Sequence, residues 1–322
     1  MAGHGGAPGA SIRGVAMAVP ERLVSNAEIA ARIGVEESWI AKRTGTATRP
    51  WAGEGERLTE FAARAGAVAL ERAGVAAGEV DLVIVATSTA DEITPNTAPQ
   101  VAGLIGAERA GAFDVGAACT GWLAGLSLAC GQIESGRAET AVVIGADFLS
   151  RFLDLSDRDT APLFADGAGA AVVARSAAGD GSRVGPVLLR SDRSGVDWIR
   201  LERGRSISMQ GQETFRAAVR RLSEVTLEAL EAAGATLAEV DLFVYHQANS
   251  RIIRAVGQRL GLPEERVVDY VARFANSSTA TLPIALTVAE AEGRLRGGAT
   301  VLLASFGGGF TWGAAVVRWG PE

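Results

Sequence analysis

The chain of 322 residues repeats part of its own sequence, and this repeat restricts its fold more than any other feature. Residues 70–82 (LERAGVAAGEVDL) and 230–242 (LEAAGATLAEVDL) agree at eight of thirteen positions without a gap, at an offset of 160 residues. Each copy reads as the end of an amphipathic helix, a glycine stop and the start of an apolar strand. An offset of about half the chain predicts two similar halves.

Later segments repeat in the same order. Residues 141–146 (AVVIGA) match 300–305 (TVLLAS), and residues 169–173 (GAAVV) recur at 313–317. We therefore expect each half to contain a helix, a strand, a buried helical region, a second strand and a terminal β segment. Apolar strands that alternate with helices favour an α/β fold with mostly parallel sheets covered on both faces.

Local composition sets the expected boundaries. Residues 1–10 (MAGHGGAPGA) lack a basic region followed by an apolar run, so we expect a disordered leader and not a signal peptide. The N-terminal half is expected at 11–175 and the C-terminal half at 187–322. The Gly- and Ser-rich segment 176–186 is the expected seam between them.

Charge and hydropathy exclude several classes of partner. Lys and Arg total 31 and Asp and Glu total 37, so the net charge of −6 gives no general reason to bind nucleic acid. One long uncharged run, 115–133, has 19 residues, which is just long enough to cross a membrane. It contains polar residues and four glycines, so a helix buried on all sides is favoured. We expect a cytoplasmic protein without a membrane partner.

Cys119 lies between a strand-like approach and this uncharged helix, in residues 114–125 (DVGAACTGWLAG). A cysteine near a helix N-terminus is favoured as the thiolate, which is the nucleophilic form. An inert buried cysteine is the alternative. Cys130 falls deep inside the same predicted helix and is expected to be structural, beyond disulfide reach of Cys119. With two Cys and two His in the chain, no zinc-ligand spacing occurs and no metal is expected.

His246 is the only histidine outside the predicted leader, which holds His4. It ends an apolar strand, and ligand crevices in folds of this kind open at the carboxyl ends of strands. His246 and Cys119 lie in opposite halves near matching strand ends, so a pseudo-twofold arrangement would bring both to one central crevice. A hydrogen-bonded core histidine is the alternative.

Two further segments carry candidate polar groups. Asn276 opens a small-residue stretch before a predicted helix (FANSSTATLP, 274–283), where a structural turn asparagine is the alternative. The glycines of 307–309 (in SFGGGFTWG, 305–313) permit a backbone that directs an N–H group at a developing oxyanion, or they form only a turn. No GxxxxGK[ST] phosphate loop is present.

Together these motifs resemble the β-ketoacyl-acyl carrier protein synthase III family. The resemblance rests on ACTGW around Cys119, HQAN at 246–249, ANSS around Asn276, GGGFTWG at 307–313, WIAKRTG at 39–45 and ADGAGAAVV at 165–173. It covers residues 11–319 in order and spacing. It implies the thiolase-like fold, in which two similar halves form a five-layered αβαβα sandwich, usually as a homodimer.

The resemblance also implies a reaction, the decarboxylative Claisen condensation that starts a fatty acid or polyketide chain. Cys119 would take an acyl group from acyl-CoA as a thioester, and malonyl-acyl carrier protein would lose carbon dioxide and attack it. His246 and Asn276 would donate hydrogen bonds to the malonyl thioester oxygen. The backbone N–H groups of Cys119 and Gly308 would form the oxyanion hole. Acyl-CoA and malonyl-carrier protein are substrates, so no cofactor is implied.

Substrate handling is implied at two sets of positions. The coenzyme A and pantetheine set is Trp39, Arg43, Thr44, Arg158, Gln212 and Asn249. The set for the acidic carrier protein is a basic patch of Arg216, Arg220, Arg251 and Arg254. The spacing of Arg216 and Arg220 on one predicted helix also fits a merely solvated face.

Two positions depart from the family pattern, and both are expected to shape the gate of the acyl pocket. Thr94 stands where many members carry an aromatic that crosses the dimer interface and caps this pocket. Trp122 replaces the usual Phe after the ACTG motif, a change expected to reshape the helix packing behind Cys119. A smaller residue at 94 would open the pocket, so we hypothesise a starter unit larger than acetyl.

Other members of the superfamily fit less well. A thiolase needs a second catalytic cysteine, a Cys-His-His synthase needs another histidine in the folded body, and chalcone-type synthases are typically longer. The enzyme alternative that stays open is transfer of the acyl group to a hydroxyl or an amine. A non-catalytic acyl-binding partner would be expected to lack the nucleophile that Cys119 supplies.

Overall fold

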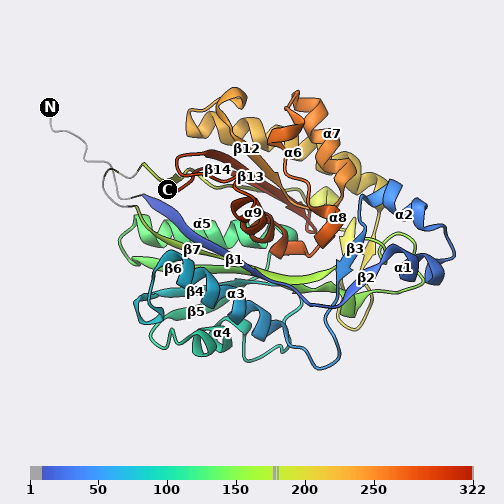
Figure 1. The fold of residues 1–322 in the computed structure, drawn as a ribbon, viewed down its shortest axis with the longest axis horizontal. Coiled ribbons are helices and arrows are strands. Elements are labelled where there is room, and N and C mark those ends of the chain that lie inside the picture. Colours follow the sequence, from blue (N-terminus) through green and yellow to red (C-terminus); the bar gives the residue numbers. More distant parts are fainter. Residues whose placement is uncertain (1–8, 177–178, 180, 321–322) are drawn as a thin grey trace.

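Two mixed β-sheets form the centre of the fold (Figure 1). The computed structural model describes residues 9–176, 179 and 181–320. The first sheet has the order β1-β7-β6-β4-β5, with β1 (Ala10–Ala18), β4 (Leu82–Ala86), β5 (Gly111–Val115), β6 (Thr140–Phe148) and β7 (Asp166–Arg175). The second has the order β12-β13-β14-β8, and β9 also pairs with β14; its strands are β8 (Arg183–Val184), β9 (Leu188–Ser191), β12 (Leu242–Tyr245), β13 (Thr300–Gly307) and β14 (Thr311–Arg318).

Helices cover both faces of each sheet and complete five layers (Figure 1). The outer face of the first sheet packs on α3 (Leu58–Ala73) and α4 (Thr97–Ile105). The outer face of the second packs on α6 (Gly211–Ala233) and α7 (Ser250–Leu260). Between the sheets lie α5 (Gly121–Glu134) and α9 (Thr281–Ala291). The order is therefore α-β-α-β-α, as the resemblance predicts.

A small lobe and short strands surround the ends of the sheets. They are α1 (Asn26–Ile33), α2 (Glu37–Thr44), α8 (Val271–Phe274), β2 (Leu23–Ser25), β3 (Thr48–Pro50), β10 (Ile199–Arg200) and β11 (Ser208–Met209). β2 pairs with β3 and β10 with β11, each antiparallel.

The two central helices explain the long uncharged run in the sequence. α5 and α9 lie between two apolar sheets, so residues on most of their faces are buried in one hydrophobic cluster. A charged side chain there would lose its hydration without a partner. No helix in the part of the chain that the structure describes is long and apolar enough to cross a membrane.

The predicted duplication is confirmed in its details. The glycine stops of α3 and α6, Gly74 and Gly234, have φ of 65° and 66°, a left-handed conformation that favours glycine. One residue before each following strand, the N–H of Asp81 donates to Thr140 O at 2.9 Å, and that of Asp241 donates to Thr300 O at 2.8 Å. β4, β6 and β7 thus correspond to β12, β13 and β14.

The expectation of mostly parallel sheets is wrong. β4 is parallel to β5 and β6, and β12 is parallel to β13, but the other pairs of the two main sheets are antiparallel. β13 and β14 are joined by residues 308–310 alone, and so short a connection reverses the chain direction. Parallel pairing needs a crossover, which α4 and α5 supply between β4, β5 and β6.

Two predicted boundaries shift. Ala10, the last residue of the expected leader, opens β1 and pairs with Arg175. The expected seam 176–186 contains β8, which pairs with β14. Residues 1–8, with His4, and residues 177–178, 180 and 321–322 lie outside the described part of the chain.

Candidate active site

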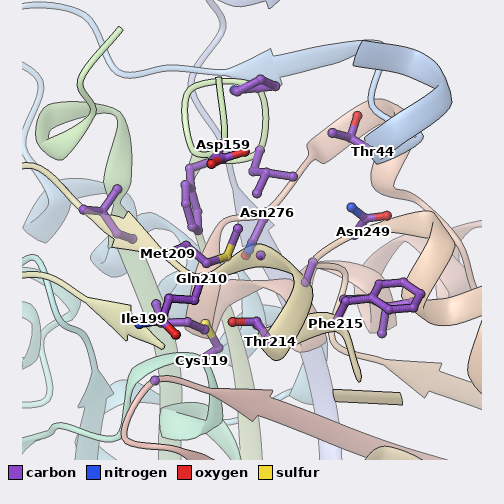
Figure 2. Close-up of a pocket in the computed structure, with 18 of the residues that line it drawn as sticks. Thr44, Cys119, Asp159, Ile199, Met209, Gln210, Thr214, Phe215, Asn249 and Asn276 are labelled. Atoms are coloured by element: carbon purple, nitrogen blue, oxygen red, sulfur yellow. The ribbon is translucent and has the colours of Figure 1, made fainter. Parts of the chain in front are cut away.

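A cavity of about 1180 Å³ brings the candidate residues together (Figure 2). Cys119 from the N-terminal half and His246 and Asn276 from the C-terminal half line it. The predicted coenzyme A and pantetheine residues line the same cavity: Trp39, Arg43, Thr44, Arg158, Gln212 and Asn249. The pairing of His246 with Cys119 across the duplicated fold is therefore as the repeat predicts.

Cys119 lies in a short 3-10 turn, η2 (Ala118–Thr120), which leads directly into α5. The second half of the chain holds this turn, because the Ser305 hydroxyl donates to the Cys119 carbonyl at 2.8 Å. A Cβ atom at Gly307 would lie 2.8 Å from the Cys119 nitrogen. Glycine is therefore required at 307, because any side chain would press on the N–H predicted to bind the oxyanion.

The thiol of Cys119 is not preformed as a thiolate. Burial raises the pKa of this thiol to about 12, against the opposing effect of the Ser278 hydroxyl, whose Oγ atom lies 3.4 Å from the sulfur. The N-terminus of α5 favours the anion but acts on a desolvated sulfur. This raised pKa does not favour the activated thiolate expected from the sequence, so the proton leaves as the thiol reacts.

His246 directly follows β12 and is fixed on both sides. Its backbone N–H donates to Ala304 O at 2.8 Å, and its Nδ1 atom lies 2.6 Å from the Oγ1 atom of Thr281. The ring of Phe306 packs edge-on against the imidazole, with centroids 5.4 Å apart. Burial lowers the pKa of His246 to about 3, so the imidazole is neutral at physiological pH.

Asn276 is held by backbone hydrogen bonds to the other half. Its N–H donates to Leu163 O at 3.0 Å, and its carbonyl accepts from Ala165 N at 2.9 Å. Its side-chain Oδ1 accepts from Ser278 N at 2.9 Å. With the oxygen occupied, the Nδ2 amide is the group left to donate into the cavity.

This arrangement suits a reaction that develops negative charge on an oxygen. Asn276 offers amide hydrogens, and a neutral His246 offers Nε2–H when the Thr281 hydroxyl donates to Nδ1. Donors fixed in a buried site stabilise such charge without reorganising. Among the described residues no group of three or more His, Cys, Asp or Glu is arranged to hold a metal ion.

Several of the predicted coenzyme A residues already use their polar groups in contacts within the protein. The Arg43 guanidinium lies over the Trp39 ring at 4.4 Å, and Arg158 donates to Ile33 O at 2.9 Å. Thr44 donates its hydroxyl to Ile40 O at 2.8 Å. Asn249 accepts from Arg251 N at 2.8 Å and donates to Arg43 O at 3.0 Å. Thr44 and Asn249 thus shape the cavity wall with hydrogen bonds of their own.

The predicted basic patch lies on two adjacent helices. Arg216 and Arg220 are exposed on α6, and Arg251 and Arg254 are exposed on α7. Arg216 and Arg251 also line the cavity. Within the described residues none of the four forms an ion pair, so their charge is available to a partner.

The two predicted gate residues do not lie at this cavity. Trp122 is fully buried among core residues of α5 and α9, and its indole N–H donates to Val143 O at 3.2 Å. Trp122 therefore does not line a gate at this cavity, and its ring packs in the core behind Cys119, where the sequence led us to expect a change in helix packing. Thr94 is exposed and does not line the cavity of its own chain, so its proposed role across an interface stays a prediction.

Sequence reasoning missed the apolar wall of the cavity. It consists of Leu149, Leu163, Phe164, Ile199, Leu201, Ile207 and Met209. The only sequence signal is the apolar-polar-apolar alternation around β10 and β11. Ser278, Thr281 and the buried Asp147 were missed too, and for Asp147 the signal is a lone acidic residue within an apolar strand.

A duplicated five-layered fold with Cys, His and Asn at its central cavity defines a protein of the thiolase-like class. Family models for 3-oxoacyl-[acyl-carrier-protein (ACP)] synthase III match residues 113–193, and for its C-terminal part residues 230–319. The chain belongs to the β-ketoacyl-acyl carrier protein synthase III family.

Individual relatives agree with this assignment. The chain is 45% identical over 311 residues to β-ketoacyl-[acyl-carrier-protein] synthase III of Paramagnetospirillum magneticum, covering 93% of this chain and 96% of the relative. The solved 3-oxoacyl-[acyl-carrier-protein] synthase III of Aquifex aeolicus superposes with a TM-score of 0.94 at 38% identity, covering 97% of this chain and 100% of that chain. The priming β-ketosynthase of the R1128 polyketide pathway superposes with a TM-score of 0.92 at 35% identity, covering 97% of each chain. These likenesses confirm the predicted family and thiolase-like fold.

Proposed function

We propose that the protein condenses an acyl-CoA starter with malonyl-acyl carrier protein through an acyl-Cys119 thioester, which starts a fatty acid or polyketide chain. The observation that carries the proposal is that one cavity holds a thiol, a neutral imidazole and a side-chain amide in a chain of this family. The names of the relatives describe the same reaction class.

In the first step the Cys119 sulfur attacks the acyl carbonyl carbon of acyl-CoA. The carbon–sulfur bond to coenzyme A then breaks, and the coenzyme leaves as a thiol after taking a proton. The tetrahedral oxyanion is bound by the N–H groups of Cys119 and Gly308. Loss of one such donor typically costs about 10²–10³ in rate.

In the second step the malonyl thioester loses carbon dioxide, and the electron pair moves onto the thioester oxygen. His246 and Asn276 donate hydrogen bonds to this oxygen. No proton transfer is needed here, so a histidine with a pKa of about 3 is suited to the task. The new carbanion attacks the acyl-Cys119 carbonyl, the carbon–sulfur bond to Cys119 breaks, and the β-ketoacyl carrier protein leaves. The released Cys119 thiolate takes up a proton from solvent, which restores the thiol.

The acyl carrier protein is the proposed macromolecular partner. Four exposed arginines lie on α6 and α7, and two of them, Arg216 and Arg251, line the cavity in a chain whose net charge is −6. Local positive charge on an acidic enzyme is the footprint expected for an acidic carrier domain. A cytoplasmic location, where both substrates occur, stays a prediction.

A homodimer is part of the same proposal. β5 is an edge strand of the first sheet, and no described strand pairs with its outer side. Phe113 on β5 is 38% exposed and Leu104 on α4 is 61% exposed, and a second copy would cover both. Sedimentation of wild type and F113D tests this: a dimer that becomes a monomer supports it, and a monomeric wild type rejects it.

A starter larger than acetyl is proposed from Thr94 and the apolar wall. A small side chain reaching across the interface would leave the pocket open, and the wall offers apolar surface to an acyl chain. Acylation rates with C2–C12 acyl-CoA donors measure the preference. A clear acetyl optimum would reject it.

Condensation and transfer to a hydroxyl or amine share the acyl-Cys119 intermediate. The favouring observation for condensation is that His246 and Asn276 both line the cavity and are both held in place by hydrogen bonds, to Thr281 and to Ser278. Supplying malonyl-carrier protein to the acylated enzyme separates the two, because only condensation releases carbon dioxide in step with loss of the acyl group. N276A should abolish that release while leaving Cys119 acylation within about threefold of wild type.

A further inference from the structure

Ser278 contacts the groups around the nucleophile in three ways. Its hydroxyl lies 3.4 Å from the Cys119 sulfur, and its backbone N–H fixes the Asn276 side chain. Its carbonyl oxygen lies 3.0 Å from the Thr281 hydroxyl, whose single proton can go either to this carbonyl or to Nδ1 of His246. The φ of Ser278 is 52°, a conformation that residues other than glycine rarely adopt. The chain therefore maintains an unfavourable backbone in order to place this residue.

The carboxyl group of Asp147 is next to Ser278 and has no role in the proposed condensation. Asp147 at the end of β6 is 0% exposed, and no described arginine or lysine forms an ion pair with it. Its Oδ1 atom accepts from Ser88 N at 2.8 Å, Thr89 Oγ1 at 3.0 Å and Thr87 Oγ1 at 3.3 Å. Its Oδ2 atom accepts from Thr279 N at 3.4 Å, and the Ser278 hydroxyl also hydrogen-bonds to this carboxyl group, which retains capacity for a proton.

The Ser278 hydroxyl interacts with both acidic groups. Burial raises the pKa of the Asp147 carboxyl, against hydrogen bonds from Ser88, Ser278 and Thr89, so this carboxylate accepts a proton more readily than an exposed one. The Asp147 charge also adds to the burial that raises the pKa of Cys119. A serine hydroxyl has one proton and two lone pairs, so it can accept a proton from one neighbour while donating its own to another.

We propose that Ser278 is a catalytic residue that relays the thiol proton of Cys119 to the buried carboxylate of Asp147 as acyl-CoA is attacked. Ser278 touches the reacting sulfur, whereas Asp147 acts through it as a proton store. This inference rests on the proposed function. It adds a route by which the proton on the Cys119 sulfur can leave, since the raised pKa keeps the thiol protonated before it reacts.

One proton moves along the relay to Asp147 and back during acylation of Cys119. The Cys119 S–H bond breaks as sulfur bonds to the acyl carbon, and the Ser278 oxygen takes that proton while its own passes to Asp147 Oδ2. When the tetrahedral intermediate collapses, the carbon–sulfur bond to coenzyme A breaks. The stored proton returns through Ser278 to the departing thiolate. Transfer before attack is uphill, so it is coupled to formation of the new bond.

Other titratable groups share the cavity and are excluded on chemical grounds. His246 contacts Thr281 through Nδ1, and its low pKa makes it a weak base. The remaining titratable residues of the cavity wall are Arg43, Arg158, Asp159, Glu213, Arg216 and Arg251. Asp147 is not among the residues that line the cavity, but its charge raises the pKa of Cys119.

The chain offers a matched control in the adjacent residue. Ser277 is also buried, and its hydroxyl has no hydrogen-bond partner among the residues that the structure describes. S277A therefore removes the same atom from the same turn without touching the relay. S278A and S278G both remove the relay hydroxyl, and because they respond oppositely to a positive φ, a shared effect cannot come from backbone strain.

The test is single-turnover acylation of Cys119 by acyl-CoA, followed by intact-protein mass spectrometry from pH 6 to 9.5. We expect S278A and S278G to lose about 10²-fold in rate at pH 7, the lower end for acid–base catalysis. Their rate should rise about tenfold per pH unit, whereas wild type and S277A stay nearly flat above neutrality. D147N should behave like S278A, and S278A/D147N should be no slower than the slower single variant.

Several results would overturn the relay. One is an S278A variant whose acylation rate and pH profile match those of wild type. Another is an S278A acylation rate that is reduced by the same factor at every pH, because that result indicates that Ser278 only positions other groups. A normal pH profile in D147N, with folding checked by circular dichroism, would remove Asp147 from the route. In each of these cases the proposed function still stands if wild type is acylated at Cys119. If wild type is not acylated there, the proposed function fails whatever the variants show.

Discussion

The Nδ1 atom of His246 lies 2.6 Å from the Oγ1 atom of Thr281, in a site where burial lowers the pKa of the histidine to about 3. The Thr281 hydroxyl also lies 3.0 Å from the Ser278 carbonyl, and it has only one proton to donate. When it donates to Nδ1, the proton of the neutral ring resides on Nε2 and can serve the malonyl thioester. Thr281 therefore controls which nitrogen of His246 is a donor.

Removing this hydroxyl should impair decarboxylation selectively. T281V leaves Nδ1 without its partner, so we expect carbon dioxide release from malonyl-carrier protein to fall by about tenfold or more, while Cys119 acylation changes little. T281S keeps the hydroxyl and should restore the rate. An equal loss in both half-reactions would contradict a specific effect on His246.

The neutral, buried His246 should make the fold sensitive to acid. Its pKa of about 3 lies below the ordinary 6.5, so the unfolded chain binds the proton first and stability falls as pH drops below about 6.5. The loss approaches about 1.4 kcal/mol per pH unit while one extra proton is bound on unfolding. Urea unfolding between pH 7.5 and 4.5 should show a shallower decline for H246Q. Equal slopes in the two proteins would show that His246 is not buried and neutral.

Cys119 should react slowly with alkylating agents at neutral pH. Its pKa of about 12 keeps the thiolate fraction small, and that fraction grows about tenfold per pH unit below the pKa. Iodoacetamide labelling of wild type should therefore rise steadily from pH 7 to 10 and be blocked by acyl-CoA, with C119A as the unlabelled control. A plateau below pH 8 would indicate a preformed thiolate.

Gly307 should tolerate no side chain. In G307A the new Cβ would lie 2.8 Å from the Cys119 nitrogen, so we expect loss of acylation together with a lower Tm. G131A is the control, because no atom lies within 4 Å of the Cβ that it adds to α5. This second variant should be neutral or gain up to about 1 kcal/mol in unfolding free energy. Normal acylation by G307A would show that close packing of Gly307 against Cys119 is not needed for the reaction.

Charge reversal on the basic patch should weaken carrier-protein binding alone. Arg220 and Arg254 are exposed and do not line the cavity, so R220E/R254E should raise the KM for malonyl-carrier protein about tenfold or more and leave acylation by acyl-CoA unchanged. R137E, an exposed site beyond α5, is the matched control. An unchanged KM in the double variant would place the docking surface elsewhere.

Much of this site follows from the sequence because duplication is visible in it. The repeat at offset 160 predicts that Cys119 and His246 meet, and the family motifs add Asn276 and Gly308. The antiparallel pairs escaped prediction because apolar runs look alike in either direction, and β7 and β14 return without a crossover helix. Trp122 was misplaced because a helix pattern does not tell which buried face meets the cavity.

The polar residues that hold the catalytic side chains in place could not be predicted from the sequence, for a different reason. Ser278 and Thr281 act through single hydrogen bonds whose partners are up to 159 residues away. Asp147 joins them from β6 only once both halves are packed. No local pattern encodes such contacts, since serine, threonine and aspartate are common in turns and at strand ends.

The central claim is that Cys119 carries the acyl group from coenzyme A to a carbanion made by decarboxylation. Intact-protein mass spectrometry with an acyl-CoA, followed by isotope-labelled malonyl-carrier protein, tests it most directly. We predict an acyl adduct that maps to Cys119 and then disappears in step with released carbon dioxide and a new β-ketoacyl carrier protein. An adduct that persists without carbon dioxide release, or that moves only to a hydroxyl or amine acceptor, would contradict the account.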